Sequence, residues 1–205
     1  MVTKQSEEGE IWEWRAFGRI SEALVATVHS HPIRMALINI EGEDVYFIAP
    51  NSDQNIKLRK YDDRWVLKFK LLLGGSPGEA ELYKESAVYS YSFPVGYDKL
   101  VATAELLRVK VSKTPASVFG ADQFARALAE ASPPVGRASV KKKRSQFEFE
   151  RGWIELAEVW FPKHHTHSIS IHSPDEGAVE LMRQQLPLGE GWEVMNYVEA
   201  CRRWA

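Results

Sequence analysis

Lysine and arginine side chains recur at alternate positions in several short segments of this 205-residue chain. Lys57 and Arg59 alternate with isoleucine and leucine, and Lys68 and Lys70 alternate with leucine and phenylalanine. Because successive side chains of a strand point to opposite faces, each pair lies on one face of its strand. Cations on neighbouring strands repel one another unless a negative group lies between them. The pattern therefore favours a surface that clamps a phosphate-rich anion.

The same two-residue period places further polar side chains on shared faces. These are Glu13 and Arg15 near the start, and Lys142, Arg144, Gln146, Glu148 and Glu150 in a later segment. Two interpretations are open. The charged faces are either solvated, as is common in antiparallel sheets, or they line a closed or half-closed sheet with helices on its apolar outside. Bulky aromatic residues on the reverse faces favour the second interpretation.

The elements that must position these residues are mostly strands. Alternation predicts strands over 11–17, 56–59, 65–71, 87–93, 140–150, 152–160 and 166–172. Helices are expected over 21–28, 98–107 and 122–131, after Ser173 and after Trp192. No shift in composition divides the chain, which favours a single domain.

The order of these segments resembles that of the CYTH superfamily, also called triphosphate tunnel metalloenzymes. The matching segments are Ile11-Trp12-Glu13-Trp14-Arg15, Asp44-Val45-Tyr46-Phe47, Lys57-Leu58-Arg59, Leu67-Lys68-Phe69-Lys70, Lys142-Lys143-Arg144 and Ser168–His172. The resemblance implies an α+β fold, an antiparallel tunnel-like β-barrel with helices packed outside, formed by residues 1–205. It also implies a phosphorylated small molecule or polyphosphate as ligand, and Mg²⁺ or Mn²⁺ as cofactor.

The resemblance implies roles for individual residues as well. The ligand-binding side chains would be Arg15, Lys57, Arg59, Lys68, Lys70, Lys142, Arg144 and His172. Glu13, with Glu148 or Glu150, would hold the metal and the attacking water, and these three would be the catalytic residues. His172 shares a face with the serines before it, which suits a phosphate contact, a proton carrier or a structural hydrogen bond.

The chain departs from the family pattern at three metal-binding glutamates, which are Ile11, Ser168 and Ser170 here, and Arg15 replaces a lysine. A single surviving carboxylate is a poor magnesium site. We therefore expect a protein that binds a triphosphate-class ligand, with at most a weak or altered metal-dependent phosphohydrolase activity. The alternative is a non-catalytic structural or partner-binding protein that keeps only the CYTH-like fold.

Composition limits the choice of partners. The net charge of −2 argues against a protein coated in positive charge for nucleic-acid binding. A single cysteine, Cys201, suits a reducing compartment, and no apolar run is long enough for a membrane span. The polar start lacks the core of a signal peptide, so a cytoplasmic location is expected.

Histidines form two groups, His29 with His31, and His164 with His165 and His167. Their spacing is compatible with zinc, but neighbouring prolines favour solvated turns for both groups. The basic run over 137–144 is compatible with nucleic acid. Its continuation into a strand predicts instead that alternate lysines face opposite sides.

Overall fold

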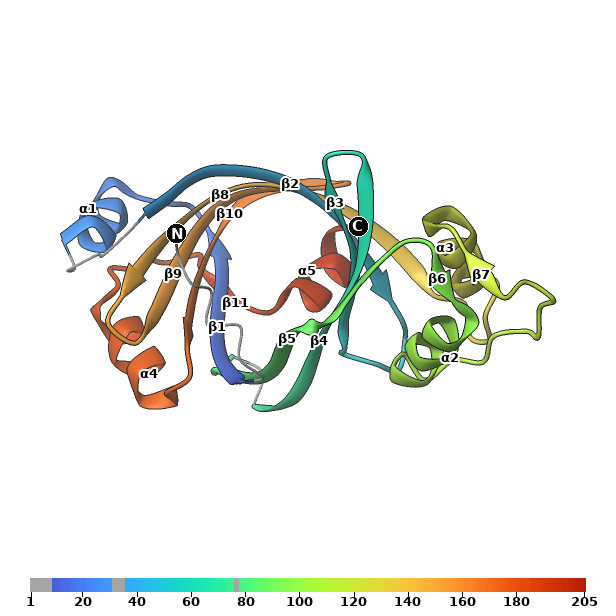
Figure 1. Ribbon diagram of the computed structural model, residues 1–205. Coiled ribbons are helices and arrows are strands. Elements are labelled where there is room, and N and C mark those ends of the chain that lie inside the picture. Colours follow the sequence, from blue (N-terminus) through green and yellow to red (C-terminus); the bar gives the residue numbers. More distant parts are fainter. Residues whose placement is uncertain (1–8, 31–35, 76–77) are drawn as a thin grey trace.

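Eight antiparallel strands close into a barrel in the computed structural model, which describes residues 9–30, 36–75 and 78–205 (Figure 1). The strands are β1 (Glu10–Gly18), β2 (Ala36–Ile48), β3 (Asn55–Tyr61), β4 (Arg64–Gly75), β5 (Glu81–Ser92), β8 (Gly136–Phe149), β9 (Gly152–Phe161) and β10 (His164–Ser173). Their order around the barrel is β1-β5-β4-β3-β2-β8-β9-β10, and β10 pairs with β1 to complete the circle. The predicted tunnel-like α+β barrel is confirmed.

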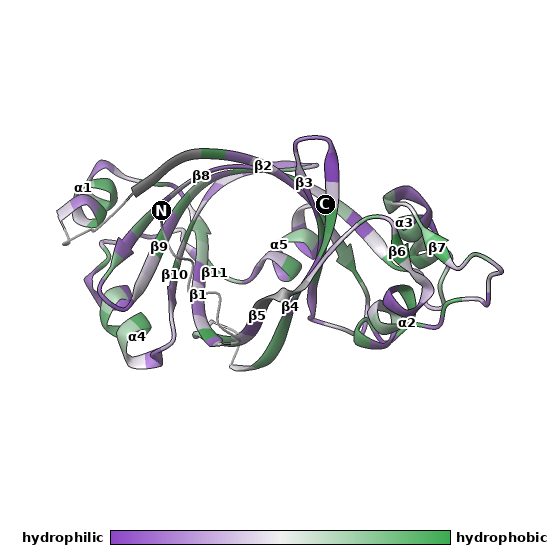
Figure 2. Cartoon of the chain, viewed as in Figure 1, coloured by the Kyte–Doolittle hydropathy of each residue, from purple (hydrophilic) through white to green (hydrophobic). Residues whose placement is uncertain are grey.

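The outside of the barrel is apolar and much of its inside is polar, whereas the inside of a small barrel is usually filled with apolar side chains. Strand β8 illustrates the alternation, since Lys142 is buried inside whereas Lys141 and Lys143 are exposed. Figure 2 shows this alternation as purple and green bands along the strands. The prediction that alternate lysines of this run face opposite sides is therefore confirmed. Of the two interpretations of the charged faces, the structure supports the lining of a closed sheet rather than a solvated surface.

Helices cover the apolar outside of the barrel in two groups, which lie on opposite sides of it in Figure 1. Leucine, valine and methionine side chains of α1 (Glu22–Ser30) and α4 (Glu176–Gln185) pack with Trp14, Ile154 and Ile171. Leucine, alanine and phenylalanine side chains of α2 (Tyr97–Leu106) and α3 (Ala121–Ala129) pack with Ile56, Leu67 and Phe69. Short strands β6 (Val95–Gly96) and β7 (Val118–Phe119) form a separate sheet beside α2 and α3.

The last helix, α5 (Tyr197–Trp204), follows the short strand β11 (Glu193–Val194) and lies within the ring of strands (Figure 1). Its buried face packs on inward-pointing side chains near one end of the barrel, among them Phe17, Tyr46 and Ala157. The helix therefore closes that end. Asn196 caps its first turn by accepting hydrogen bonds from the amides of residues 198 and 199, at 2.9 and 3.0 Å.

Two expectations about strand ends are wrong. Strand β8 ends at Phe149, so Glu150 lies in an exposed turn and strand alternation no longer fixes its direction. His164 and His165 belong to β10 rather than to a loop, because a two-residue turn is enough to join β9 to β10 and pairs His164 with Phe161. His31, of the other histidine group, lies outside the described residues. No helix among the described residues is both long and apolar enough to cross a membrane.

Candidate functional site

Seven cationic side chains point into the barrel from four different strands. They are Arg15 of β1, Lys57 and Arg59 of β3, Lys68 and Lys70 of β4, and Lys142 and Arg144 of β8. Seven of the eight predicted ligand-binding residues are thus the lysines and arginines of one lining, and the eighth, His172, joins them from β10. Two clusters organise this lining, one around Asp44 and one around Glu13 and Glu155.

Asp44 carries three cations on a single carboxylate. Arg59 donates to it through two nitrogens, with Nε 2.7 Å from Oδ1 and Nη2 2.9 Å from Oδ2. The Nζ atoms of Lys142 and Lys57 lie 2.9 and 3.5 Å from Oδ2. Cross-strand pairing explains the convergence, because Asp44 of β2 lies directly opposite Arg59 of β3. This group, which we call the Asp44 cluster, has an excess of positive charge.

The lowered pKa of Lys57 indicates that the Asp44 cluster contains too little negative charge. Burial together with the neighbouring Arg59 and Lys142 lowers the pKa of Lys57 well below its usual value, although Asp44 acts in the opposite direction. The ionised form of Asp44 is strongly stabilised, because its three cations hold the pKa of its carboxyl well below the usual range in spite of burial. A further anion beside Lys57 would therefore be stabilising.

Two tyrosine rings complete the Asp44 cluster. Lys142 Nζ donates a 2.6 Å hydrogen bond to the hydroxyl of Tyr46 and lies 3.6 Å from the ring centre of Tyr197. The two rings stack on each other with their centres 5.4 Å apart. Because Tyr197 belongs to α5, the helix that closes the barrel also forms part of the site.

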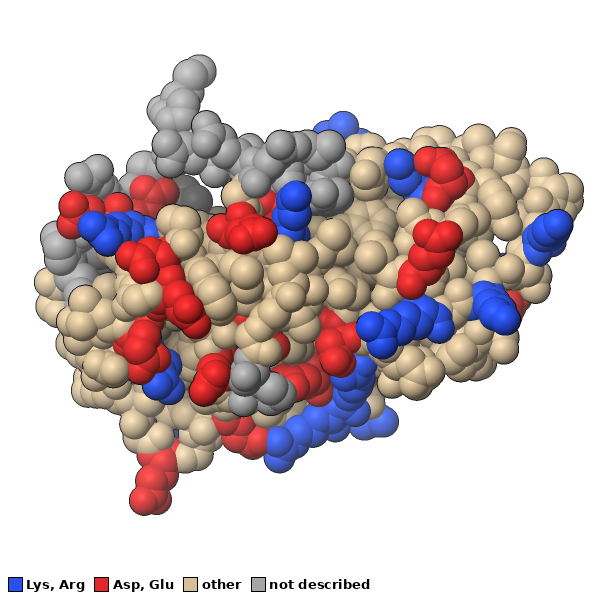
Figure 3. All heavy atoms as spheres, turned by 90° about the horizontal axis from the view of Figure 1, so that it is seen from below, with Lys and Arg blue, Asp and Glu red and all other residues tan. Residues whose placement is uncertain are grey.

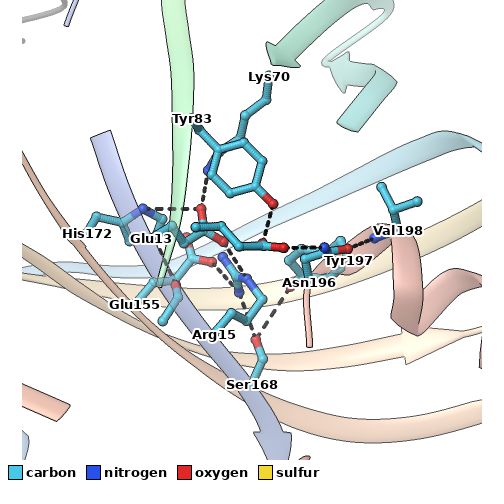
Figure 4. Close-up of polar contacts among 12 residues, drawn as sticks. Glu13, Arg15, Lys70, Tyr83, Glu155, Ser168, His172, Asn196, Tyr197 and Val198 are labelled. Atoms are coloured by element: carbon cyan, nitrogen blue, oxygen red, sulfur yellow. Dashed lines mark hydrogen bonds and ion pairs between the residues drawn. The ribbon is translucent and has the colours of Figure 1, made fainter. Parts of the chain in front are cut away.

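The second cluster contains Glu13 and Glu155, and Figure 4 shows its contacts. Glu13 accepts a 2.8 Å hydrogen bond from Arg15 Nε and pairs with the ammonium of Lys70. Glu155 lies 3.7 Å from Arg15 and 3.6 Å from Arg144. Burial raises the pKa of Glu155, but Arg15 and Arg144 outweigh it and lower this pKa to about 2. Both carboxyls are therefore ionised at neutral pH.

His172 is buried between the two clusters and the far end of the barrel. Its ring stacks on Trp153 at 4.6 Å, and its Nε2 lies 2.8 Å from the hydroxyl of Ser170. Burial, together with Lys70 and Arg15, lowers the pKa of His172 to about 4, although Glu13 raises it. The imidazole is therefore neutral at physiological pH, and its Nδ1 lies 3.4 Å from Oε2 of Glu13 in a geometry that is not a hydrogen bond.

The three predicted metal ligands do not come together. Glu13 is buried and bound to Arg15 and Lys70, and Glu150 is exposed in the turn after β8. Glu148 shares a cross-strand row with Glu13, but the stacked rings of His172 and Trp153 stand between them. Nowhere in the described chain do three His, Cys, Asp or Glu side chains gather in a way that would hold a metal ion. The residues present do not fit Mg²⁺ or Mn²⁺.

Several residues of the site were not predicted as site residues. They are Asp44, Tyr46, Glu85 and Tyr197. Strand alternation alone places Asp44 and Tyr46 on one face, so this pair left a signal in the sequence. Lys68, which was predicted, lies opposite Lys57 on the inner face and is only partly buried.

Comparison with known proteins supports the fold. No protein-family model matches the sequence, and no curated protein matches it. A conserved hypothetical protein from Pyrococcus furiosus matches 92% of this chain and 98% of its own, with a TM-score of 0.50 and 18% identity. A putative adenylyl cyclase from Hippeastrum, described as having a dominant triphosphatase activity, matches 95% of both chains with a TM-score of 0.54 and 14% identity. The barrel is thus similar to that of triphosphatase- and adenylyl-cyclase-like proteins.

Proposed function

We propose that this protein binds a phosphorylated small molecule or polyphosphate of the triphosphate class inside its barrel. The observation that carries the proposal is the Asp44 cluster, in which Lys57, Arg59 and Lys142 share one carboxylate. Two buried cations and a partly buried one around a single anion are costly unless a further negative group joins them. A chain of phosphates supplies several charged oxygens within a narrow volume, and arginine and lysine are the side chains that bind them.

The similarity in fold to a described triphosphatase and the order of basic strand motifs support the same ligand class. We propose on these grounds that the chain is a divergent member of the CYTH superfamily. On the face seen in Figure 3, acidic and basic side chains are interspersed, which makes that face a poor surface for nucleic acid. A polymer held along the surface needs a continuous basic stripe instead.

Hydrolysis is not part of the proposal. In-line attack on a phosphate needs an oriented water and charge neutralisation at the transferred group, which a divalent ion usually supplies. The carboxylates that would hold such an ion, Glu13 and Glu155, are occupied by arginine and lysine. We therefore expect binding without release of inorganic phosphate.

Isothermal titration calorimetry with sodium tripolyphosphate tests the proposal, with Lys142→Ala as the site variant. Lys141→Ala is the matched control, because the two lysines are neighbours on β8 and only Lys142 points inward. Lys142→Ala should weaken binding about tenfold or more, the value of a lost charged hydrogen bond, and Lys141→Ala should stay within about twofold.

Three results would contradict the proposal. Absence of binding to the wild-type chain would favour the structural or partner-binding alternative. Equal loss of affinity in the two variants would place the ligand outside the barrel. Steady release of inorganic phosphate in the presence of Mg²⁺ would show a metal-dependent hydrolase instead of a binding protein. Lys57→Ala, which changes the same cluster from another strand, is a second site variant if Lys142→Ala does not fold.

A further inference from the structure

We infer that the guanidinium of Arg15 is a built-in replacement for a divalent metal ion, so that the barrel takes its anion without magnesium or manganese. Part of this inference rests on the proposed polyphosphate ligand. The rest concerns only the carboxylates of the chain and does not depend on that ligand.

Arg15 lies where it neutralises two carboxylates from different strands (Figure 4). Its Nε is 2.8 Å from Oε1 of Glu13 on β1, and its Nη1 is 3.7 Å from Oε1 of Glu155 on β9. The same Nη1 donates a 3.3 Å hydrogen bond to the hydroxyl of Ser168. Below the guanidinium plane, the ring of Tyr197 lies with its centre 4.4 Å from Cζ. The guanidinium is therefore fixed by contacts at its edges and on one face.

The strand register explains why this place is free for an arginine. Arg15 pairs with Ser170 across β1 and β10, and Ser170 pairs with Glu155 across β10 and β9. A glutamate at position 170 would put a further carboxylate between Arg15 and Glu155. Serine is short and neutral there, and its hydroxyl is taken by His172 at 2.8 Å.

The charges around Glu13 and Glu155 oppose the entry of a metal ion. Arg15, Lys70 and Arg144 are the cations that contact these two carboxylates. Each of the two carboxylates is thus already paired with two cations, although Lys70 also contacts Glu85 at 3.6 Å. A hard divalent cation such as Mg²⁺ needs oxygen ligands, at about 2.0–2.1 Å. The carboxylates of Glu13 and Glu155 would first have to lose the cations that contact them.

A metal ion between protein carboxylates and a polyphosphate has two effects, because it neutralises the carboxylates and binds the phosphate oxygens. Arg15 and Lys70 provide the first effect permanently. The second effect passes to the cations of the Asp44 cluster, which already point inward. The ligand would therefore bind equally well in the presence of a chelator.

Manganese binding, followed by the electron paramagnetic resonance signal of free Mn²⁺, tests the inference without any phosphate. Wild-type protein should leave the Mn²⁺ signal unchanged. Arg15→Gln, which removes the one cation that Glu13 and Glu155 share, should gain Mn²⁺ affinity by about tenfold or more. Arg59→Gln is the control, because it also removes an inward-pointing guanidinium, here a partly buried one, but leaves Asp44 with Lys57 and Lys142.

Wild-type binding of Mn²⁺ as tight as that of Arg15→Gln would overturn the inference, and so would an equal gain in Arg59→Gln. The wild-type titration decides even if a variant fails to fold. A second measurement compares calorimetric titrations of wild-type protein with tripolyphosphate in EDTA and in Mg²⁺. Binding that appears only with Mg²⁺ would refute the inference but not the proposed ligand, whereas no binding in either buffer would refute the proposed ligand alone.

Discussion

Lys142 and Tyr197 meet inside the barrel, with the ammonium of the lysine 3.6 Å from the centre of the tyrosine ring. One residue belongs to a barrel strand and the other to the first turn of the C-terminal helix. Lys142 also contacts Asp44 at 2.9 Å, so the ring holds one of the cations proposed to bind phosphate. We therefore expect the position of α5 to affect the affinity of the proposed site.

Replacement of Tyr197 tests this coupling. Tyr197→Leu should lower both the free energy of unfolding and the affinity for tripolyphosphate, since a buried cation–π contact is worth about 2 kcal/mol. Tyr197→Phe keeps the ring and should preserve most of both quantities. Urea unfolding and calorimetry measure the two effects. Equal losses in the leucine and phenylalanine variants would assign the effect to the hydroxyl rather than to the ring.

Asp44→Asn should destabilise the free protein strongly. The change leaves Lys57, Arg59 and Lys142 together without their shared carboxylate, and loss of one partner of a buried ion pair costs about 3–5 kcal/mol. Tripolyphosphate should restore much of the loss, because it brings negative charge to the same place. Asp53→Asn is the control, since that exposed carboxylate pairs with Arg202 at the surface and should cost about 1 kcal/mol or less. A variant that is insensitive to tripolyphosphate would argue against anion binding at this cluster.

The lowered pKa of His172 should cause the protein to lose stability in mild acid. Its pKa in the folded protein is about 4, below the ordinary value of 6.5, because burial disfavours the charged ring. The unfolded chain therefore takes up a proton first, and stability that is full above about pH 6.5 falls by about 3 kcal/mol as the pH drops to 4. Urea unfolding between pH 7.5 and 4 measures this slope, which should be shallower in His172→Gln. An unchanged slope in the variant would show that another group causes it.

Protonation of the buried carboxylates should lower the free energy of unfolding further, at a lower pH than protonation of His172. The pKa of Glu155 is about 2, and the cations around Glu13 and Asp44 lower the pKa values of both well below the usual range. Their stabilising effect is full above about pH 4.5 and is lost as the pH falls toward 2. Glu155→Gln should remove part of this second loss, as judged from urea titrations extended to pH 2. It should also deepen the first loss slightly, because Glu155 raises the pKa of His172.

Asn196→Ala should destabilise the protein more than loss of an ordinary helix cap. Asn196 caps α5 and also donates a 2.9 Å hydrogen bond to Glu81 of β5, so the change should cost about 1 kcal/mol for the cap and more for the second contact. Asp175→Ala removes the exposed cap of α4 and is the matched control. The free energies of unfolding of the two variants should differ, and equal values would mean that the contact with Glu81 adds nothing.

Much of the barrel lining could be predicted because it follows a local rule. The two-residue period placed Lys57 and Arg59, and likewise Lys142 and Arg144, on one face without knowledge of their neighbours. The role of Asp44 could not be predicted in this way. It depends on pairing between strands distant in sequence, since Lys142 lies 98 positions from Asp44.

Strand ends and helix surroundings escaped prediction for a related reason. Alternation continues in the sequence through Glu150, but the turn between β8 and β9 begins there. The helix expected after Trp192 is present as α5, and its residues Tyr197, Val198 and Cys201 form a buried apolar stripe. The stripe did not reveal that the helix faces the inside of the barrel, because an amphipathic helix packs equally well against either side of a sheet.

The closure of one barrel end by α5 determines from which end a ligand can enter. Inner side chains near the helix, such as Phe17 and Val159, are apolar, while Glu148 and Trp153 lie toward the opposite rim. We therefore expect a ligand of the barrel to enter and leave on the side of Glu148 and Trp153, with its phosphates directed toward α5.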